Sequence, residues 1–200
     1  MSLRHSYTLF APIYDLLIAR ASEPLRRKSL ARLEGEAGEQ VLIAGIGSGL
    51  DIPYLPSGPC YVGIDLTPAM LQRARPRAAT RGDIELRVGD VMALPFDDGS
   101  FDTIVMHLIL AVVPEPERAL REAERVLKPG GRILLLDKFL RPGQHAPLRR
   151  LLNTITRHLA TRTDVVFEDV LKCCSTLEVT RDTPALAGGW FRHIELQKRE

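Results

Sequence analysis

Short apolar runs alternate with amphipathic stretches along the chain, and the first such run covers residues 41–44. A run of this length is typical of a strand buried on both faces of a parallel sheet. We expect four more strands, at residues 61–64, 84–88, 103–107 and 132–136. Helices are expected between them, at about residues 68–79 and 115–127. Strands that alternate with helices predict an α/β fold with a parallel sheet.

The two ends of the chain add further elements. Ser22 has the residue type of a helix N-cap, and Gly35 lies where such a helix would end. Near the C-terminus, helix-like stretches at 147–161 and 165–174 precede strand-like runs at 177–181 and 190–197. The short connection between these runs predicts an antiparallel pair. We therefore expect one domain over residues 1–200, with an N-terminal helical lid (1–40), a central core (41–137) and a C-terminal part (138–200).

Composition and charge narrow the classes of function. The chain has 200 residues, of which 45% are hydrophobic and 26% charged, as in ordinary globular proteins. No apolar run approaches the ~18–20 residues that cross a bilayer, and the N-terminus lacks the pattern of a secretory signal. A net charge of +2 is too small to indicate a nucleic-acid partner. We expect a cytoplasmic protein that does not bind nucleic acid.

A glycine-rich loop, Gly45-Ile-Gly-Ser-Gly49, follows the first expected strand. Glycines there let the backbone turn tightly and approach a ligand closely, although an ordinary strand-to-helix turn is the alternative. Asp65 ends the second strand, where a carboxylate can accept hydrogen bonds from both hydroxyls of a ribose. A nicotinamide-binding loop would place its third glycine at position 50, which is Leu50. The pattern therefore favours another adenosyl ligand.

A further acid, Asp90, follows the third strand and can accept the exocyclic amine of adenine; a turn residue beside Gly89 is the alternative. With these motifs the sequence resembles the class I S-adenosylmethionine-dependent methyltransferases. The matching segments are residues 41–49, 63–71, 89–96, 101–105 and 125–132. The resemblance implies a Rossmann-like, seven-stranded, mostly parallel sheet with helices on both faces and an antiparallel last strand. It also implies S-adenosylmethionine over the carboxyl ends of the first strands, and no metal.

The resemblance also implies roles for individual residues. The expected contacts are Gly45, Gly47 and Gly49 with the methionine part, Asp65 and Leu66 with the ribose, and Met70, Asp90 and Val91 with the adenine. Met106 and His107 would face the reacting centre, and Tyr14 would close over the donor or, alternatively, pack into the core. His107 is the candidate base for an amine acceptor, and a hydrogen-bonded residue at a strand end is the alternative.

One position departs from the family pattern. The family usually has Asp or Glu two residues before the first glycine, and this chain has Ile43. An interaction with the charged amine of the donor is then missing, so either binding is weaker or another group compensates. Restoring the acid by Ile43→Glu is expected to raise donor affinity unless the pocket has been rebuilt. A non-catalytic protein that binds S-adenosylmethionine is the alternative of another class.

Two features point to the methyl acceptor. Residues 7–15 and 110–118 resemble the bacterial phospholipid N-methyltransferases that act on phosphatidylethanolamine, and quinone C-methyltransferases share a looser form of both. Residues 138–163 contain no acid, and a helix over 148–162 would place leucines opposite Arg149, Arg150 and Arg157. Such a helix can lie peripherally on an anionic inner membrane, or it can pack its leucines onto the domain. We expect a phosphatidylethanolamine-like acceptor, with a quinone precursor or a small soluble molecule as the alternative.

Overall fold

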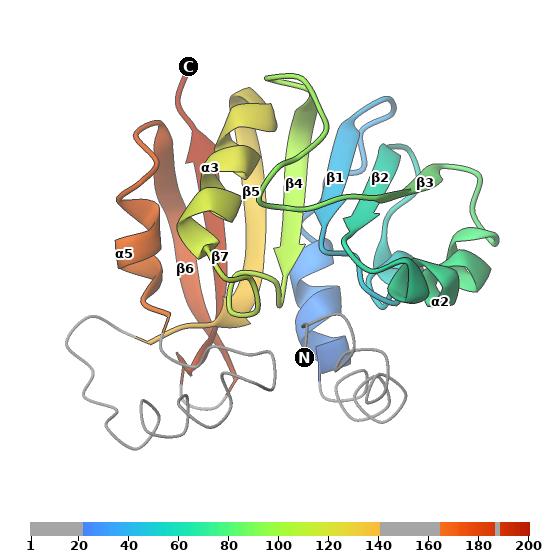
Figure 1. The fold of residues 1–200 in the computed structure, drawn as a ribbon, viewed down its shortest axis with the longest axis horizontal. Coiled ribbons are helices and arrows are strands. Elements are labelled where there is room, and N and C mark those ends of the chain that lie inside the picture. The colour runs from blue at the N-terminus through green and yellow to red at the C-terminus, as the bar shows by residue number, and fades with distance from the viewer. Residues whose placement is uncertain (1–21, 141–164, 187–188) are drawn as a thin grey trace.

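The central element of the computed structural model is a seven-stranded sheet in the order β3-β2-β1-β4-β5-β7-β6 (Figure 1). The structure describes residues 22–140, 165–186 and 189–200. Their strands are β1 (Gln40–Ala44), β2 (Cys60–Asp65), β3 (Ile84–Val88), β4 (Phe101–His107), β5 (Leu127–Lys138), β6 (Leu177–Leu186) and β7 (Phe191–Lys198). Their helices are η1 (Ile52–Tyr54), α2 (Pro68–Ala78), α3 (Pro116–Val126), α5 (Phe167–Leu171) and a helical segment over residues 22–30.

The directions of the strands confirm the predicted topology. Strand β1 is parallel to β2 and β4, β2 is parallel to β3, and β4 is parallel to β5. Strand β7 is antiparallel to both of its neighbours, β5 and β6. The five parallel strands therefore end at the same edge of the sheet, and the loops that leave this edge lie next to one another.

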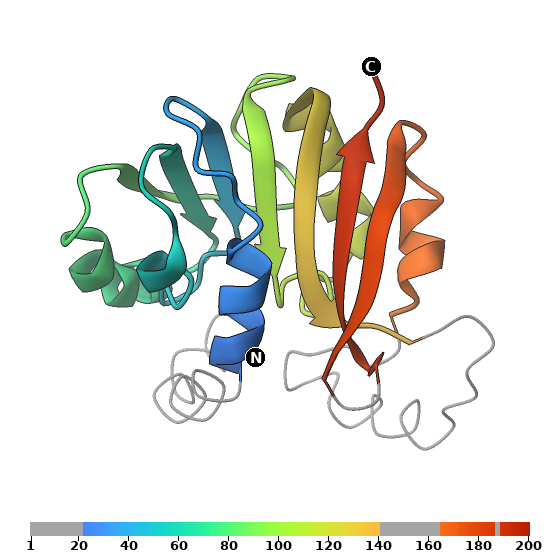
Figure 2. The ribbon, with the colours of Figure 1, turned by 180° about the vertical axis from the view of Figure 1, so that it is seen from behind.

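Helices cover both faces of the sheet, as the family resemblance implies. Leu42 and Ala44 of β1 belong to a core cluster that includes residues of α3 and α5. Val41 and Ile43 alternate with them and pack in a second cluster with residues of α2 and with Leu30 from the segment 22–30. Figure 1 shows α3 and α5 in front of the sheet, and Figure 2 shows residues 22–30 across the opposite face. Strand β1 is therefore buried on both sides.

Several elements differ in extent from the sequence prediction. Strand β5 begins at Leu127, directly after α3, because Leu127 pairs with Phe101 across a register shift. Strand β6 continues to Leu186 because it pairs with β7 along a long hairpin. Helix α5 covers only five residues, and the stretch 147–161 lies outside the described residues. Ser22 is already helical, and its hydroxyl accepts a hydrogen bond from Arg26 Nε (3.1 Å).

Ile43, where an added acid is expected to raise donor affinity, lies in the apolar core, so the same substitution also affects stability. Ile43 is 1% exposed, and the cluster around it consists of apolar side chains. We expect Ile43→Glu to lower the free energy of unfolding by about 2–4 kcal/mol, because a carboxyl group would be buried without a designed partner. Urea denaturation measures this change. Ile43→Val, which removes one methylene and costs about 1 kcal/mol, is the matched control. A glutamate variant as stable as the valine variant would contradict the prediction.

Candidate functional site

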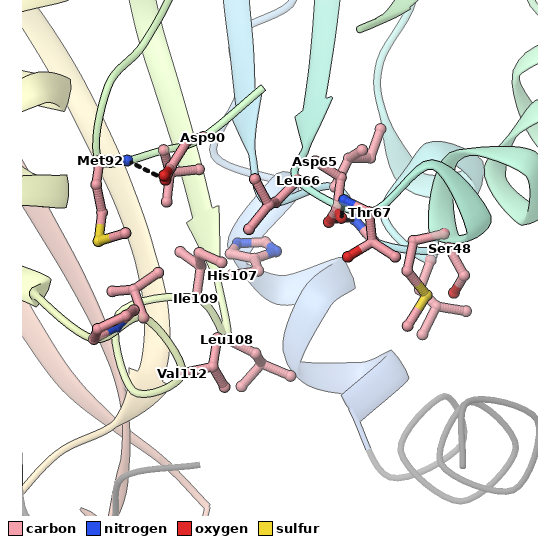
Figure 3. Close-up of a pocket in the computed structure, with 18 of the residues that line it drawn as sticks. Ser48, Asp65, Leu66, Thr67, Asp90, Met92, His107, Leu108, Ile109 and Val112 are labelled. Atoms are coloured by element: carbon pink, nitrogen blue, oxygen red, sulfur yellow. Dashed lines mark hydrogen bonds between the residues drawn. The ribbon is translucent and has the colours of Figure 1, made fainter. Parts of the chain in front are cut away.

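A cavity of about 240 Å³ opens at the carboxyl edge of the parallel strands (Figure 3). Its wall is formed by the loops that follow β1, β2, β3 and β4, together with Arg26 from the segment 22–30. In the view of Figure 3, Asp65 and Thr67 lie on one side of His107, and Asp90 and Met92 lie on the other. Residues from four separate chain segments therefore meet in one place, as expected at the edge of an open α/β sheet.

The glycine loop forms the part of the wall that follows β1. Gly45 and Gly47 both have positive φ angles, of 78° and 56°, which favour glycine. A Cβ atom on Gly45 would lie 2.7 Å from Ile109 Cδ1, so this glycine permits close packing of two loops. A Cβ atom on Gly47 would meet no atom within 4 Å. Gly47 thus leaves its side of the cavity open for a ligand.

Asp65 connects the glycine loop to the end of β2. Its Oδ2 accepts a hydrogen bond from the backbone N–H of Gly47 (3.0 Å), and its Oδ1 accepts one from the N–H of Thr67 (2.8 Å). Burial raises the pKa of this carboxyl group, and the two backbone hydrogen bonds oppose the rise. A carboxylate has about four lone-pair sites, so Asp65 can also accept hydrogen bonds from a pair of ligand hydroxyls.

The loop after β3 forms the opposite wall. Asp90 Oδ1 accepts a hydrogen bond from the N–H of Met92 (2.9 Å), which is the turn geometry that the sequence allowed as an alternative. Helix α3 holds this loop in place, because Glu122 accepts from the N–H of Leu94 (2.8 Å) and Arg125 donates to the Leu94 carbonyl (2.9 Å). Asp90 still lines the cavity, so the turn does not remove it from the site.

His107 lines the cavity, but both of its ring nitrogens have protein partners. Nδ1 lies 2.8 Å from Asp51 Oδ1, and Nε2 lies 2.9 Å from the hydroxyl of Ser29. A carboxylate only accepts hydrogen bonds, so Nδ1 carries a proton that it donates to Asp51, and Nε2 shares a hydrogen bond with the Ser29 hydroxyl. This arrangement leaves no nitrogen lone pair directed at a substrate. The geometry matches the alternative interpretation, a hydrogen-bonded histidine at a strand end, rather than a catalytic base.

Asp51 and Arg26 form a buried ion pair that sequence reasoning missed. Arg26 Nη1 lies 2.9 Å from Asp51 Oδ1, and the two side chains are 9% and 3% exposed. Burial opposes the charge on Asp51, but Arg26 and His107 outweigh it and hold the pKa of the carboxyl group well below its usual range. The sequence does contain one sign of this polar cluster. Ser22, Arg26 and Ser29 follow the i, i+4, i+7 spacing that places residues on a single helix face.

Three residues expected at the donor are not among the described residues that line the cavity. Gly49 is not among the residues that line the cavity; a Cβ atom on it would lie 2.7 Å from Ile52 Cδ1, so it permits close packing of the loop. Met106 is 1% exposed and belongs to the core cluster that includes α3. Tyr14 lies outside the described residues. The expected residues that do line the cavity are Gly45, Gly47, Asp65, Leu66, Met70, Asp90, Val91 and His107.

The loop after β4 closes the cavity with apolar side chains, among them Ile109, Val112 and Val113. Leu108 begins this loop with φ of 56°, a conformation that costs about 1–2 kcal/mol in a non-glycine residue. Two contacts hold the loop in this conformation. The N–H of Leu108 donates to the Leu136 carbonyl (2.7 Å), and the N–H of Ala111 donates to Asp137 Oδ2 (3.0 Å).

Comparisons with known proteins agree with this geometry. The family model described as "Methyltransferase domain" matches residues 42–135. The chain is 35% identical to a phosphatidylethanolamine N-methyltransferase of Cereibacter sphaeroides, over 99% of this chain and 98% of that protein. The chain belongs to the class I S-adenosylmethionine-dependent methyltransferases. It is also 33% identical to a demethylmenaquinone methyltransferase of Tropheryma whipplei (strain Twist), over 80% of this chain and 70% of that one.

Solved structures show the same fold around the site of this methyltransferase. A chain from the complex between the Haloferax volcanii Trm112 methyltransferase activator and a methyltransferase aligns with a TM-score of 0.79, at 20% identity and full coverage of both chains. A geranyl diphosphate C-methyltransferase of Streptomyces coelicolor A3(2) aligns with a TM-score of 0.71, at 18% identity, over 90% of this chain and 80% of that one. The family model and the 35% identical relative, rather than these structures, show that the protein is an S-adenosylmethionine-dependent enzyme.

Asp137 gives the methyltransferase a pH-dependent stability that can be measured. Burial raises the pKa of this carboxyl group from 3.8 to about 6, and hydrogen bonds from backbone N–H groups only partly oppose the rise. The folded protein therefore keeps a proton that the unfolded chain releases near pH 4. The stabilising contribution of Asp137 is complete below pH 4 and is lost as the pH rises to about 6.

We expect the free energy of unfolding of the wild type, minus that of Asp137→Asn, to fall by about 2 kcal/mol between pH 4 and pH 6. Urea titrations of both proteins across this range measure the difference. The subtraction removes the contributions of the other carboxyl groups, which titrate in both proteins. A difference that stays constant with pH would show that Asp137 is charged throughout.

Proposed function

We propose that this methyltransferase transfers a methyl group to the head-group amine of a phosphatidylethanolamine-like phospholipid. The observation that carries the proposal is the 35% identity to a phosphatidylethanolamine N-methyltransferase, which extends over nearly the whole of both chains. The resemblance is thus not limited to the cofactor-binding core at 42–135, where methyltransferases of many kinds are alike. It includes the N-terminal and C-terminal parts of the chain, which lie outside that core.

We also propose how the donor lies in the cavity. The ribose hydroxyls donate hydrogen bonds to Asp65, the adenine lies between the loops after β2 and β3 beside Asp90, and the methionine part lies over the open side of Gly47. Two observations support this fit: the space that a Cβ atom on Gly47 would fill, and the half-buried carboxylate of Asp65 in the wall of the cavity. When bound, S-adenosylmethionine supplies a methyl group on a positively charged sulfur.

Replacement of Asp65 by alanine tests the ribose contact. Loss of charge-assisted hydrogen bonds should weaken binding of S-adenosylhomocysteine by about tenfold to a hundredfold. Calorimetric titration measures this change. Asp65→Asn is the matched variant, because it keeps one acceptor oxygen and should lose less affinity than alanine. Thermal melting of the ligand-free variants separates a loss of contact from a loss of fold, and an unchanged dissociation constant in a folded alanine variant would refute the ribose assignment.

The acceptor side of the cavity is consistent with an amine carried on a lipid. Alkyl amines have pKa values near ~10, and the lone pair that attacks the methyl group must be free of a proton. Burial in apolar surroundings lowers the pKa of an amine, and the loop with Ile109, Val112 and Val113 provides such surroundings. The role of the chain is then to hold the amine in line with the sulfur–carbon bond and to exclude water.

A quinone precursor is the second candidate acceptor. The observation that favours it is the 33% identity to a demethylmenaquinone methyltransferase over 80% of this chain. An aromatic ring would also fit the apolar loop after β4. The two candidates differ in the nucleophile, because phosphatidylethanolamine presents nitrogen and a quinone precursor presents a ring carbon. Product analysis therefore distinguishes them.

We further propose that the enzyme reaches its acceptor at an anionic membrane surface in the cytoplasm. Among the described residues, no helix is long and apolar enough to cross a bilayer. The stretch 148–162, whose sequence predicts an interfacial helix, lies outside the described residues. The proposal rests on its composition, because apolar burial and several arginines act together at such a surface, with each arginine contributing about 1 kcal/mol.

Sedimentation with vesicles containing phosphatidylglycerol and phosphatidylethanolamine tests the acceptor and the membrane together. We expect binding that weakens with added salt, because salt screens the arginines, and transfer of labelled methyl to phosphatidylethanolamine. The triple variant Arg149→Gln, Arg150→Gln, Arg157→Gln should lose vesicle binding and keep its affinity for S-adenosylhomocysteine.

The matched control is a triple variant at three exposed arginines in α2 and α3, namely Arg75→Gln, Arg118→Gln, Arg121→Gln. It removes the same charge and should retain vesicle binding. Equal losses in both variants would show a nonspecific effect of net charge. A protein that labels a demethylated quinone and no lipid would refute the phospholipid proposal and support the second candidate.

A further inference from the structure

The segment 22–30 contributes one charged side chain, Arg26, to the wall of the donor cavity. We propose that Arg26 binds the α-carboxylate of S-adenosylmethionine, and that Asp51 is the positioning residue that holds Arg26 in place. The pair would then make the site selective for donors that carry this carboxylate. The proposal concerns the donor only and is independent of which acceptor the enzyme methylates.

The distribution of charge along the cavity supports this assignment. Among the lining residues that the structure describes, the titratable side chains are Arg26, Asp65, Asp90 and His107. The two acids follow β2 and β3, on one side of β1, whereas His107 ends β4 on the other side. Arg26 lies with His107, because both contact the same oxygen of Asp51. Among the described lining residues, Arg26 is thus the one arginine or lysine, and it lies with His107, away from the acids to which the ribose and adenine are assigned above.

The contacts of Arg26 fix its position before any ligand binds. Its Nη1 is 2.9 Å from Asp51 Oδ1, and its Nε donates to the Ser22 hydroxyl at 3.1 Å. Asp51 is held in turn by His107 Nδ1, at 2.8 Å. A long side chain restrained at two nitrogens loses less entropy when it binds a ligand, which is the usual advantage of a preorganised site.

Asp51 also offsets the repulsion between the positive charge of Arg26 and the positive charges of the donor. S-adenosylmethionine carries positive charge on both its sulfur and its amine, so an unpaired arginine beside it would repel the ligand as a whole. The carboxylate of Asp51 neutralises Arg26, so the guanidinium N–H groups can recognise a carboxylate without adding net positive charge to the cavity. The family places an acid at the position of Ile43, and in this chain that side chain is in the apolar core.

Two ligands that differ by one group test the proposal. S-adenosylhomocysteine carries the α-carboxylate, and S-adenosyl-3-thiopropylamine is the same molecule without it. We expect the wild type to bind the first at least about tenfold more tightly, as measured by calorimetric titration. Arg26→Gln should weaken binding of S-adenosylhomocysteine by about tenfold or more and leave binding of the thiopropylamine within about threefold, so the preference collapses. Arg26→Lys, which keeps the charge but not the planar fork, should give an intermediate preference.

Controls separate recognition from folding. Arg27→Gln removes the same charge from an exposed position of the same helical segment and should keep the full preference. Arg26→Gln leaves Asp51 buried without its charged partner, and this variant could fail to fold for that reason. The double variant Arg26→Gln, Asp51→Asn removes both charges. Its ligand preference decides the outcome if the single variant does not fold. Equal weakening of both ligands in these variants, or a wild type that does not distinguish the ligands, would overturn the proposal. A preference that survives in the folded double variant would overturn it as well.

Discussion

The negative charge of Asp51 is the constraint on which the cavity wall around Arg26 depends. An ion that is 2% exposed costs several kcal/mol unless an opposite charge and hydrogen-bond donors surround it. Arg26, from the segment 22–30, supplies the opposite charge, and His107, at the end of β4, supplies a hydrogen bond. The helical segment must therefore dock against the sheet for the carboxylate to be satisfied, and docking places Arg26 in the wall of the cavity. Fold and site are coupled through one buried charge.

The parallel sheet explains why so much of the site could be predicted from the sequence. Each strand ends at the same edge, so a residue that follows a strand is placed there whatever the distance along the chain. Gly47, Asp65 and Asp90 are 18 and 25 residues apart and still line one cavity. The apolar runs in the sequence predict the strands, and the glycines and acids that come directly after these runs predict the site. Local sequence is sufficient because the sheet supplies the long-range order.

The parts that sequence reasoning missed depend on side chains that meet across the fold. His107 contacts Asp51 and Ser29, which are 56 and 78 residues away, and no motif links these positions. Without that knowledge a histidine beside the reacting centre resembles a base. The extension of β5 to Leu127 depends on its pairing with Phe101, which is likewise a long-range feature.

The engagement of His107 changes what the protein has to do for the reaction. A sulfonium methyl group is already electrophilic, so the chain does not need to provide a nucleophile, and the acceptor mainly has to be placed and kept dry. The loop after β4 is suited to that task, because Asp137 and Leu136 hold its backbone and Leu108 is kept in a strained conformation. A loop fixed in this way presents its apolar side chains at constant positions. An apolar surface at constant positions favours exclusion of water and a fixed orientation of the acceptor, which are the two requirements of methyl transfer from a sulfonium.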